Sequence, residues 1–167
     1  MPSRHREQEQ SAAWWPSMNI SLNELERNLS DLIKVLRSSG GTRPDITRSL
    51  TNEVCIWARK NNFSTSCEHK VFGVVYSKER IIKRGKAKGE PRATGYIDVW
   101  ARKPTLDPLS KLEEIAFEID HGNKIRSLDK LLWAHKNGAQ AVWIRWGGNF
   151  IIPVPKEIHL IDLQKVW

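Results

Sequence analysis

Two acidic residues stand inside otherwise apolar segments of the 167-residue chain. Asp98 is enclosed in Gly-Tyr-Ile-Asp-Val-Trp-Ala, and Glu118 in Ile-Ala-Phe-Glu-Ile, which Asp120 follows. Carboxylates set in apolar strands cost free energy unless they pair with a cation, accept hydrogen bonds or bind a metal ion. Carboxylate oxygens are the ligands that hard divalent ions prefer. The spacing therefore predicts a site for Mg²⁺ or Mn²⁺ with Asp98 and Glu118 as ligands.

Strand periodicity predicts which side chains share a face with these acids. Side chains alternate between the two faces of a sheet, so Asp98 is expected opposite to Ile97 and Val99. By the same rule, Glu118 and Asp120 share a face. If the two strands are neighbours, as short connections favour, Asp98 and Glu118 lie within reach of one metal ion. The alternative is that these acids are exposed and pair with nearby Lys or Arg side chains.

The rest of the chain predicts the elements that would position the two strands. Leucines at helical spacing between Ser21 and Gly40 indicate a first helix, with Ser21 and Glu24 as a capping box. A meander of strands with a helical crossover implies an α/β protein whose mixed sheet is covered by helices. Residues 150–167 are expected to add an edge strand or a helical turn. The helix–strand–strand–strand–helix–strand series is predicted at residues 45–61, 64–76, 95–101, 114–120, 123–137 and 139–146.

This element order and acidic spacing resemble the PD-(D/E)XK phosphodiesterase superfamily over roughly residues 45–146. Asp98 matches the family's Asp on the second core strand, and Glu118 matches the acid on the third. Glu53, in Thr-Asn-Glu-Val, matches a Glu that many members carry on the first core helix. The resemblance implies a restriction-endonuclease-like α-β-β-β-α-β core, here with an extra N-terminal helix. It also implies a Mg²⁺- or Mn²⁺-dependent deoxyribonuclease.

The sequence departs from the family pattern two residues after Glu118, where Asp120 replaces the usual Lys. Some members are similar in supplying the cation from the following helix, where Lys124 and Lys130 are the candidates here. Asp120 is then either a further metal ligand or the group that orients the lysine. His121, directly after Asp120, is interpreted as a surface histidine at a strand end, with contact to a phosphate as the alternative.

A basic segment at residues 78–92 predicts a polyanionic partner. The chain holds 27 Lys and Arg against 19 Asp and Glu, a formal net charge of +8. Cations that neutralise phosphates release condensed counterions, so this charge favours binding to DNA, with RNA as the alternative. The residues expected to contact phosphates are Lys78, Arg80, Lys83, Arg84, Lys86, Lys88 and Arg92.

Composition bounds the remaining expectations. A flexible tail at residues 1–17 is expected to precede a single domain at residues 18–167. The apolar runs are too short to cross a membrane, and Cys55 and Cys67 lack zinc or disulfide-framework spacing, which favours the cytoplasm. A homodimer is compatible, because many nucleases pair subunits to cut two strands. The rival functions are a non-catalytic nucleic-acid-binding module and a structural protein that binds a partner.

Overall fold

The structure is a computed structural model that describes residues 19–74, 94–104, 112–148 and 152–165. The expected tail at residues 1–17 and the basic segment at residues 78–92 lie outside the described residues. None of the helices within the described ranges is both long and apolar enough to span a bilayer.

The described residues form an α/β structure around a five-stranded mixed sheet with the order β1-β2-β3-β4-β5. Strands β1 to β3 pair antiparallel, whereas β4 runs parallel to β3 and to β5. The predicted order of elements is confirmed, and the C-terminal region contributes both an edge strand and a short 3-10 helix. The elements are α1 (Asn19–Ser38), α2 (Arg43–Lys60), β1 (Ser64–Phe72), β2 (Thr94–Lys103), β3 (Glu113–Asp120), α3 (Ile125–Lys136), β4 (Gln140–Arg145), β5 (Ile158–Asp162) and η1 (Leu163–Lys165).

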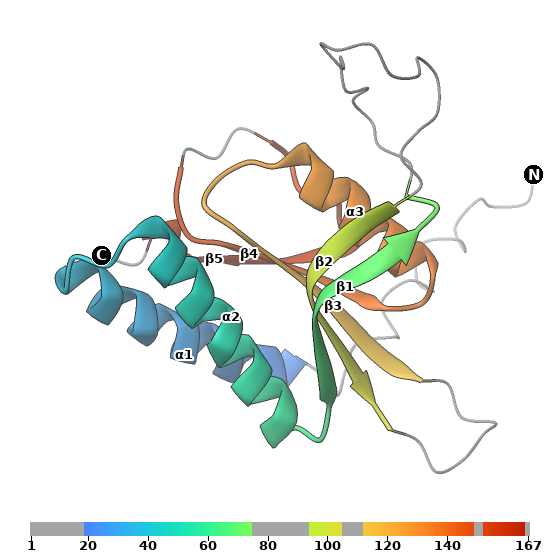
Figure 1. The fold of residues 1–167 in the computed structure, drawn as a ribbon, viewed down its shortest axis with the longest axis horizontal. Coiled ribbons are helices and arrows are strands. Elements are labelled where there is room, and N and C mark those ends of the chain that lie inside the picture. Colours follow the sequence, from blue (N-terminus) through green and yellow to red (C-terminus); the bar gives the residue numbers. More distant parts are fainter. Residues whose placement is uncertain (1–18, 75–93, 105–111, 149–151, 166–167) are drawn as a thin grey trace, which may run out of the picture.

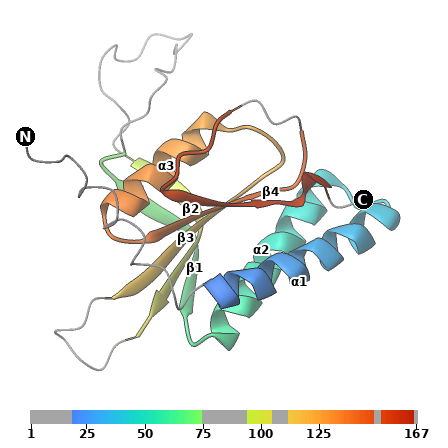
Figure 2. The same cartoon turned by 180° about the vertical axis from the view of Figure 1, so that it is seen from behind.

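The helices cover the sheet from both sides (Figures 1 and 2). Helices α1 and α2 pack on one face, and α3 packs on the other. Burial of apolar side chains in both layers drives this arrangement. The α1/α2 face includes Leu25, Leu29, Ile33, Leu50, Val54, Trp57, Val99, Phe117 and Ile144. The α3 face includes Ile97, Trp100, Ala116, Leu128, Leu131 and Trp143.

The two N-terminal helices begin differently from the prediction. Helix α1 starts at Asn19, two residues before Ser21, and the side chain of Ser21, on which the predicted capping box depends, lies outside what the structure describes. Helix α2 has Thr42 as its N-cap, an extended residue whose hydroxyl accepts a hydrogen bond from the amide of Asp45. Pro44 near the start of α2 costs the helix no hydrogen bond, because the first amides of a helix have no intrahelical partner.

A local break in β1 and β2 changes the faces that their side chains occupy. Residues on either side of Glu68 and Asp98 pair across the two strands, but these two form no ladder pair. Glu68 has a φ of 50°, a left-handed conformation that L residues adopt at a cost. Ile97 packs on the α3 side, whereas Val99 packs on the α1/α2 side. The prediction that Ile97 and Val99 share a face is therefore wrong, because regular alternation is interrupted between them.

Helix α1 should be an integral part of the domain. Leu29 is fully buried between α1 and the sheet, whereas Val35 on the same helix is 62% exposed. We expect Leu29→Ala to lower the free energy of unfolding by about 2–5 kcal/mol, because it leaves a cavity. Val35→Ala should change that free energy by less than about 0.5 kcal/mol. Denaturant unfolding measures both, and equal effects would contradict the packing of α1.

Candidate functional site

Asp98 occupies the point where β2 and β3 separate. The ladder between these strands ends at the pair Val99 and Phe117. Beyond that pair, Asp98 Oδ2 accepts a hydrogen bond of 2.7 Å from the backbone amide of Ile119. The carboxylate thus provides the acceptor that a neighbouring strand would otherwise supply, and it lies between β2 and β3 rather than above the sheet. This hydrogen bond fixes one oxygen of Asp98.

Glu118 is buried beside a lysine from α3. Glu118 is 1% exposed, and Lys130 Nζ lies 2.6 Å from Glu118 Oε1. That contact is an ion pair, and it leaves Oε1 facing the ammonium group of Lys130. Lys130 Nζ also donates a hydrogen bond of 2.5 Å to the carbonyl oxygen of Tyr96. Strand β2 and Glu118 together hold the ammonium in one place.

The buried setting of Glu118 raises its affinity for a proton. Burial, together with the negative charge of Asp98, raises the pKa of Glu118 from 4.5 to about 8, although Lys130 and Ser127 oppose the shift. Burial also raises the pKa of Asp98, against the Ile119 amide and Lys130. Both carboxyl groups therefore lie in surroundings that disfavour their ionised forms.

Asp120 is buried at the end of β3 with both oxygens engaged. Lys124 Nζ lies 2.7 Å from Asp120 Oδ1, and Trp143 Nε1 donates a hydrogen bond of 3.0 Å to Oδ2. The hydrogen bond to Asp120 is the main cause of the raised pKa of Lys124, and the charges of Asp98 and Glu118 add to it. Lys124 therefore interacts electrostatically with all three carboxylates.

The resulting cluster combines three carboxylates with two ammonium groups. We call it the carboxylate cluster: Asp98, Glu118 and Asp120 with Lys124 and Lys130. If every member ionised, one negative charge would be in excess in a buried setting, which is unfavourable without a further cation or a proton.

Glu53 lies apart from this cluster. It is on α2, which packs on the α1/α2 face of the sheet, whereas Lys130 approaches the carboxylates from α3. Asn28 Nδ2 on α1 donates a hydrogen bond of 3.2 Å to Glu53 Oε1. The structure thus places Glu53 between two helices and does not bring it to Asp98 and Glu118.

Three contributions to the site were not predicted from the sequence. Glu68 lies opposite Asp98, and its charge contributes to the raised pKa of Asp98. The carbonyl of Tyr96 holds Lys130, and the indole of Trp143 holds Asp120. A backbone carbonyl carries no sequence signal. The contact of Trp143 with Asp120 has one signal in the sequence, because Trp143 lies on a predicted strand next to β3.

Arg145 is a further buried charge on the end of β4. It is fully buried, and its guanidinium donates hydrogen bonds to the side-chain oxygens of Asn123 and Gln164. Burial lowers the pKa of Arg145, against the charge of Asp162. Because Arg145 pairs in register with Asp120, the ends of β3 and β4 share one polar region.

Two carboxylates of the cluster could hold a metal ion. Within the described ranges, no three Asp, Glu, His or Cys side chains converge as a set of metal ligands. Mg²⁺ nevertheless commonly uses one or two protein carboxylates, with water and substrate phosphate completing its shell. Asp98 and Glu118 fit that requirement by the chemistry of their oxygens, and an ion there would share Glu118 with Lys130 Nζ, which lies 2.6 Å from Oε1.

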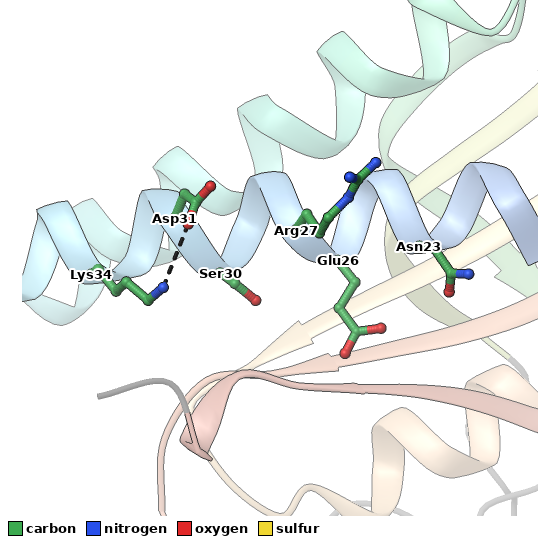
Figure 3. Close-up of a pocket in the computed structure, with 6 residues that line it drawn as sticks. All are labelled: Asn23, Glu26, Arg27, Ser30, Asp31 and Lys34. Carbon is green, nitrogen blue, oxygen red and sulfur yellow. Dashed lines mark ion pairs between the residues drawn. The ribbon is translucent and has the colours of Figure 1, made fainter.

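A hollow along α1 does not belong to this cluster (Figure 3). It is lined by residues of that helix alone, and these carry charges of both signs, with Lys34 and Asp31 paired at 3.5 Å. Helix α1 packs on the opposite face of the sheet from α3. The hollow therefore offers no group that could act with Asp98 or Glu118. Its lining residues are Asn23, Glu26, Arg27, Ser30, Asp31 and Lys34.

No protein-family model, curated protein or solved structure matches the chain. The functional conclusion below therefore rests on the geometry and charge of the carboxylate cluster.

The raised pKa of Glu118 predicts a stability that depends on pH in metal-free buffer. The folded state holds the Glu118 proton up to about pH 8, whereas the unfolded chain releases it near 4.5. The free energy of unfolding should therefore fall as the pH rises between these values. Glu118→Gln, which mimics the protonated acid, should flatten this dependence and be more stable than wild type at about pH 9 by roughly 1–3 kcal/mol.

Denaturant unfolding across this pH range provides the measurement. Glu113→Gln is the matched control, because Glu113 lies on the same strand but is exposed and pairs with Lys103. It should keep the wild-type pH dependence. A Glu118→Gln profile that parallels wild type would contradict the burial of a protonated Glu118.

Proposed function

We propose that this protein is a Mg²⁺-dependent phosphodiesterase that hydrolyses DNA. The observation that carries the proposal is the convergence of Asp98 and Glu118, from the second and third strands, with Lys130 from the following helix. Phosphodiester hydrolysis requires an activated water and neutralisation of the negative charge that develops on the phosphoryl and leaving oxygens. Carboxylates that hold a divalent ion, beside a fixed ammonium group, meet both requirements.

The arrangement of elements supports a restriction-endonuclease-like fold. From α2 to β4 the chain runs helix, three antiparallel strands, helix and a strand parallel to the third. This order is the one that the resemblance to the PD-(D/E)XK superfamily implies, with α1 as the extra N-terminal helix. Asp98 lies midway along β2 and Glu118 lies near the end of β3, at the point where the ladder between the two strands stops.

Asp98 and Glu118 would hold the ion. Asp98 keeps one oxygen outside its hydrogen bond to Ile119, and Glu118 would offer the ion a carboxylate that Lys130 contacts through Oε1. When bound, Mg²⁺ supplies a Lewis acid that polarises a phosphoryl oxygen and lowers the pKa of water. The protein contributes fixed ligands in a buried setting, where charges interact more strongly than in water.

Lys130 is the better candidate for the catalytic cation. Its ammonium group is held by the Tyr96 carbonyl and lies against Glu118, so it can donate to an oxygen that gains negative charge. Lys124 is instead paired with Asp120, whose second oxygen is held by Trp143. We therefore assign Asp120 the role of orienting Lys124, rather than that of a metal ligand.

A non-catalytic nucleic-acid-binding module on the same fold is the second candidate. It is favoured by the contact between Lys130 and Glu118, since an ammonium group already lies against the carboxyl group that a metal ion would need. In both candidates DNA is the preferred partner, with the basic residues 78–92 as the proposed phosphate contacts. The two candidates differ in whether a divalent ion binds and DNA is cut.

Nicking of supercoiled plasmid with Mg²⁺ or Mn²⁺ tests the nuclease proposal. Asp98→Ala should abolish nicking, because it removes a metal ligand. Lys130→Met should slow nicking by about 10²-fold or more with little loss of DNA affinity, and Lys124→Met should slow it less. Lys136→Met is the matched control, since Lys136 is exposed at the far end of α3.

Two results would contradict the proposal. Wild-type protein that nicks no DNA form while still binding DNA would favour the non-catalytic module. Nicking that survives in both Asp98→Ala and Lys130→Met would exclude the carboxylate cluster as the active site.

A further inference from the structure

A second group of cationic side chains lies beyond the end of β3, around His121. Burial and the positive charges of Arg43, Arg37 and Lys124 lower the pKa of His121. Geometry places Arg37 in this region through its contact with Trp146, and Arg43 begins α2 directly after the short turn that ends α1. The three cations come from the end of α1, the start of α2 and the N-cap of α3, and Figures 1 and 2 show the first two of these segments side by side.

Direct contacts tie this group to the sheet. Arg37 Nη2 donates a hydrogen bond of 2.6 Å to the carbonyl oxygen of Trp146, directly after β4. The ring of Trp146 in turn packs edge-on against His121, with ring centroids 4.4 Å apart. Arg37 and His121 therefore both contact Trp146.

Two glycine-containing loops form the base of this surface. A Cβ on Gly147 would lie 2.3 Å from Cδ2 of His121, so only glycine lets the imidazole rest against that loop. A Cβ on Gly148 would lie 3.0 Å from the Cα of Gly122, so the loops after β3 and β4 pack backbone against backbone. This close packing fixes His121 in position.

We propose that Arg37, Arg43 and His121 form a contact site for a backbone phosphate of the nucleic-acid substrate, next to the carboxylate cluster. The inference rests on the proposed function and extends it, because it places a second phosphate contact on the described part of the chain. Like charges that face one another repel, and an anion between them removes that repulsion. A phosphate suits the group, since arginine binds phosphate through paired N–H donors.

Lys124 links this surface to the proposed active site. It lies 2.7 Å from Asp120, its pKa responds to the charges of Asp98 and Glu118, and its own charge acts on His121. The carboxylate cluster and the cationic surface are thus neighbours on either side of Lys124.

Arg43→Gln provides the test, because Arg43 is exposed at the first turn of α2 and its loss leaves the core intact. Arg59→Gln is the matched control, with an exposed arginine at the other end of the same helix. Binding of a fluorescent DNA duplex is measured without divalent metal, from about 50 to 200 mM salt. Arg43→Gln should weaken binding several-fold and lower the slope of log affinity against log salt by about 0.9, as expected for one lost phosphate contact. Arg43→Glu should weaken binding further.

The result for Arg59→Gln decides the outcome. If Arg43→Gln shifts the slope no more than Arg59→Gln does, or if wild-type protein binds no duplex, the phosphate site is overturned. Plasmid nicking is scored separately. A changed slope without nicking would keep the phosphate site and reject the nuclease, whereas nicking with an unchanged slope would reject only the phosphate site.

Discussion

Buried negative charge at the point where β3 leaves β2 is the constraint on which the rest of the site depends. Asp98, Glu118 and Asp120 meet there with Lys124 and Lys130, so full ionisation would leave one carboxylate without a counter-charge. Such a surplus is unfavourable in a protein interior unless a proton or a cation removes it. Without a metal ion, the raised pKa of Glu118 means that a proton removes the surplus charge. In the proposed Mg²⁺ site, the metal ion would remove it instead.

The topology of the sheet creates this position. Strand β3 pairs antiparallel with β2 over residues 113–117 and parallel with β4 over residues 115–120, so the amide of Ile119 has no ladder partner in β2. Asp98 accepts a hydrogen bond from that amide. A helix must follow β3 for the chain to reach a parallel β4, and this connection brings Lys124 and Lys130 to the acids. The same strand end carries His121 toward Arg37 and Arg43. One strand end therefore supplies both the acidic and the cationic parts of the proposed site.

Local patterns in the sequence were enough to predict the element order, the mixed sheet and the meeting of Asp98, Glu118 and α3. Apolar periodicity reports burial, and these elements are defined by it. The place of Glu53 could not be predicted, because family spacing does not say which face of α2 meets the sheet. The left-handed conformation of Glu68 and the change of sheet face between Ile97 and Val99 depend on how β1 pairs with β2. These strands are far apart in the sequence, so no short stretch of residues predicts their pairing. Asp120 was predicted as a ligand or an orienting group, and only its contacts with Lys124 and Trp143 favour the second role.

Proton release on metal binding tests the central claim most directly. Calorimetric titration of Mn²⁺ into the protein at about pH 7, repeated in buffers of different ionisation enthalpy, counts the protons released per ion bound. Because Glu118 holds its proton up to about pH 8 without metal, binding should release close to one proton in wild type, whereas Glu118→Gln, which lacks this ligand, should lose most of its Mn²⁺ affinity. An absence of Mn²⁺ binding, or binding whose proton release is the same in Glu118→Gln as in wild type, would contradict the account.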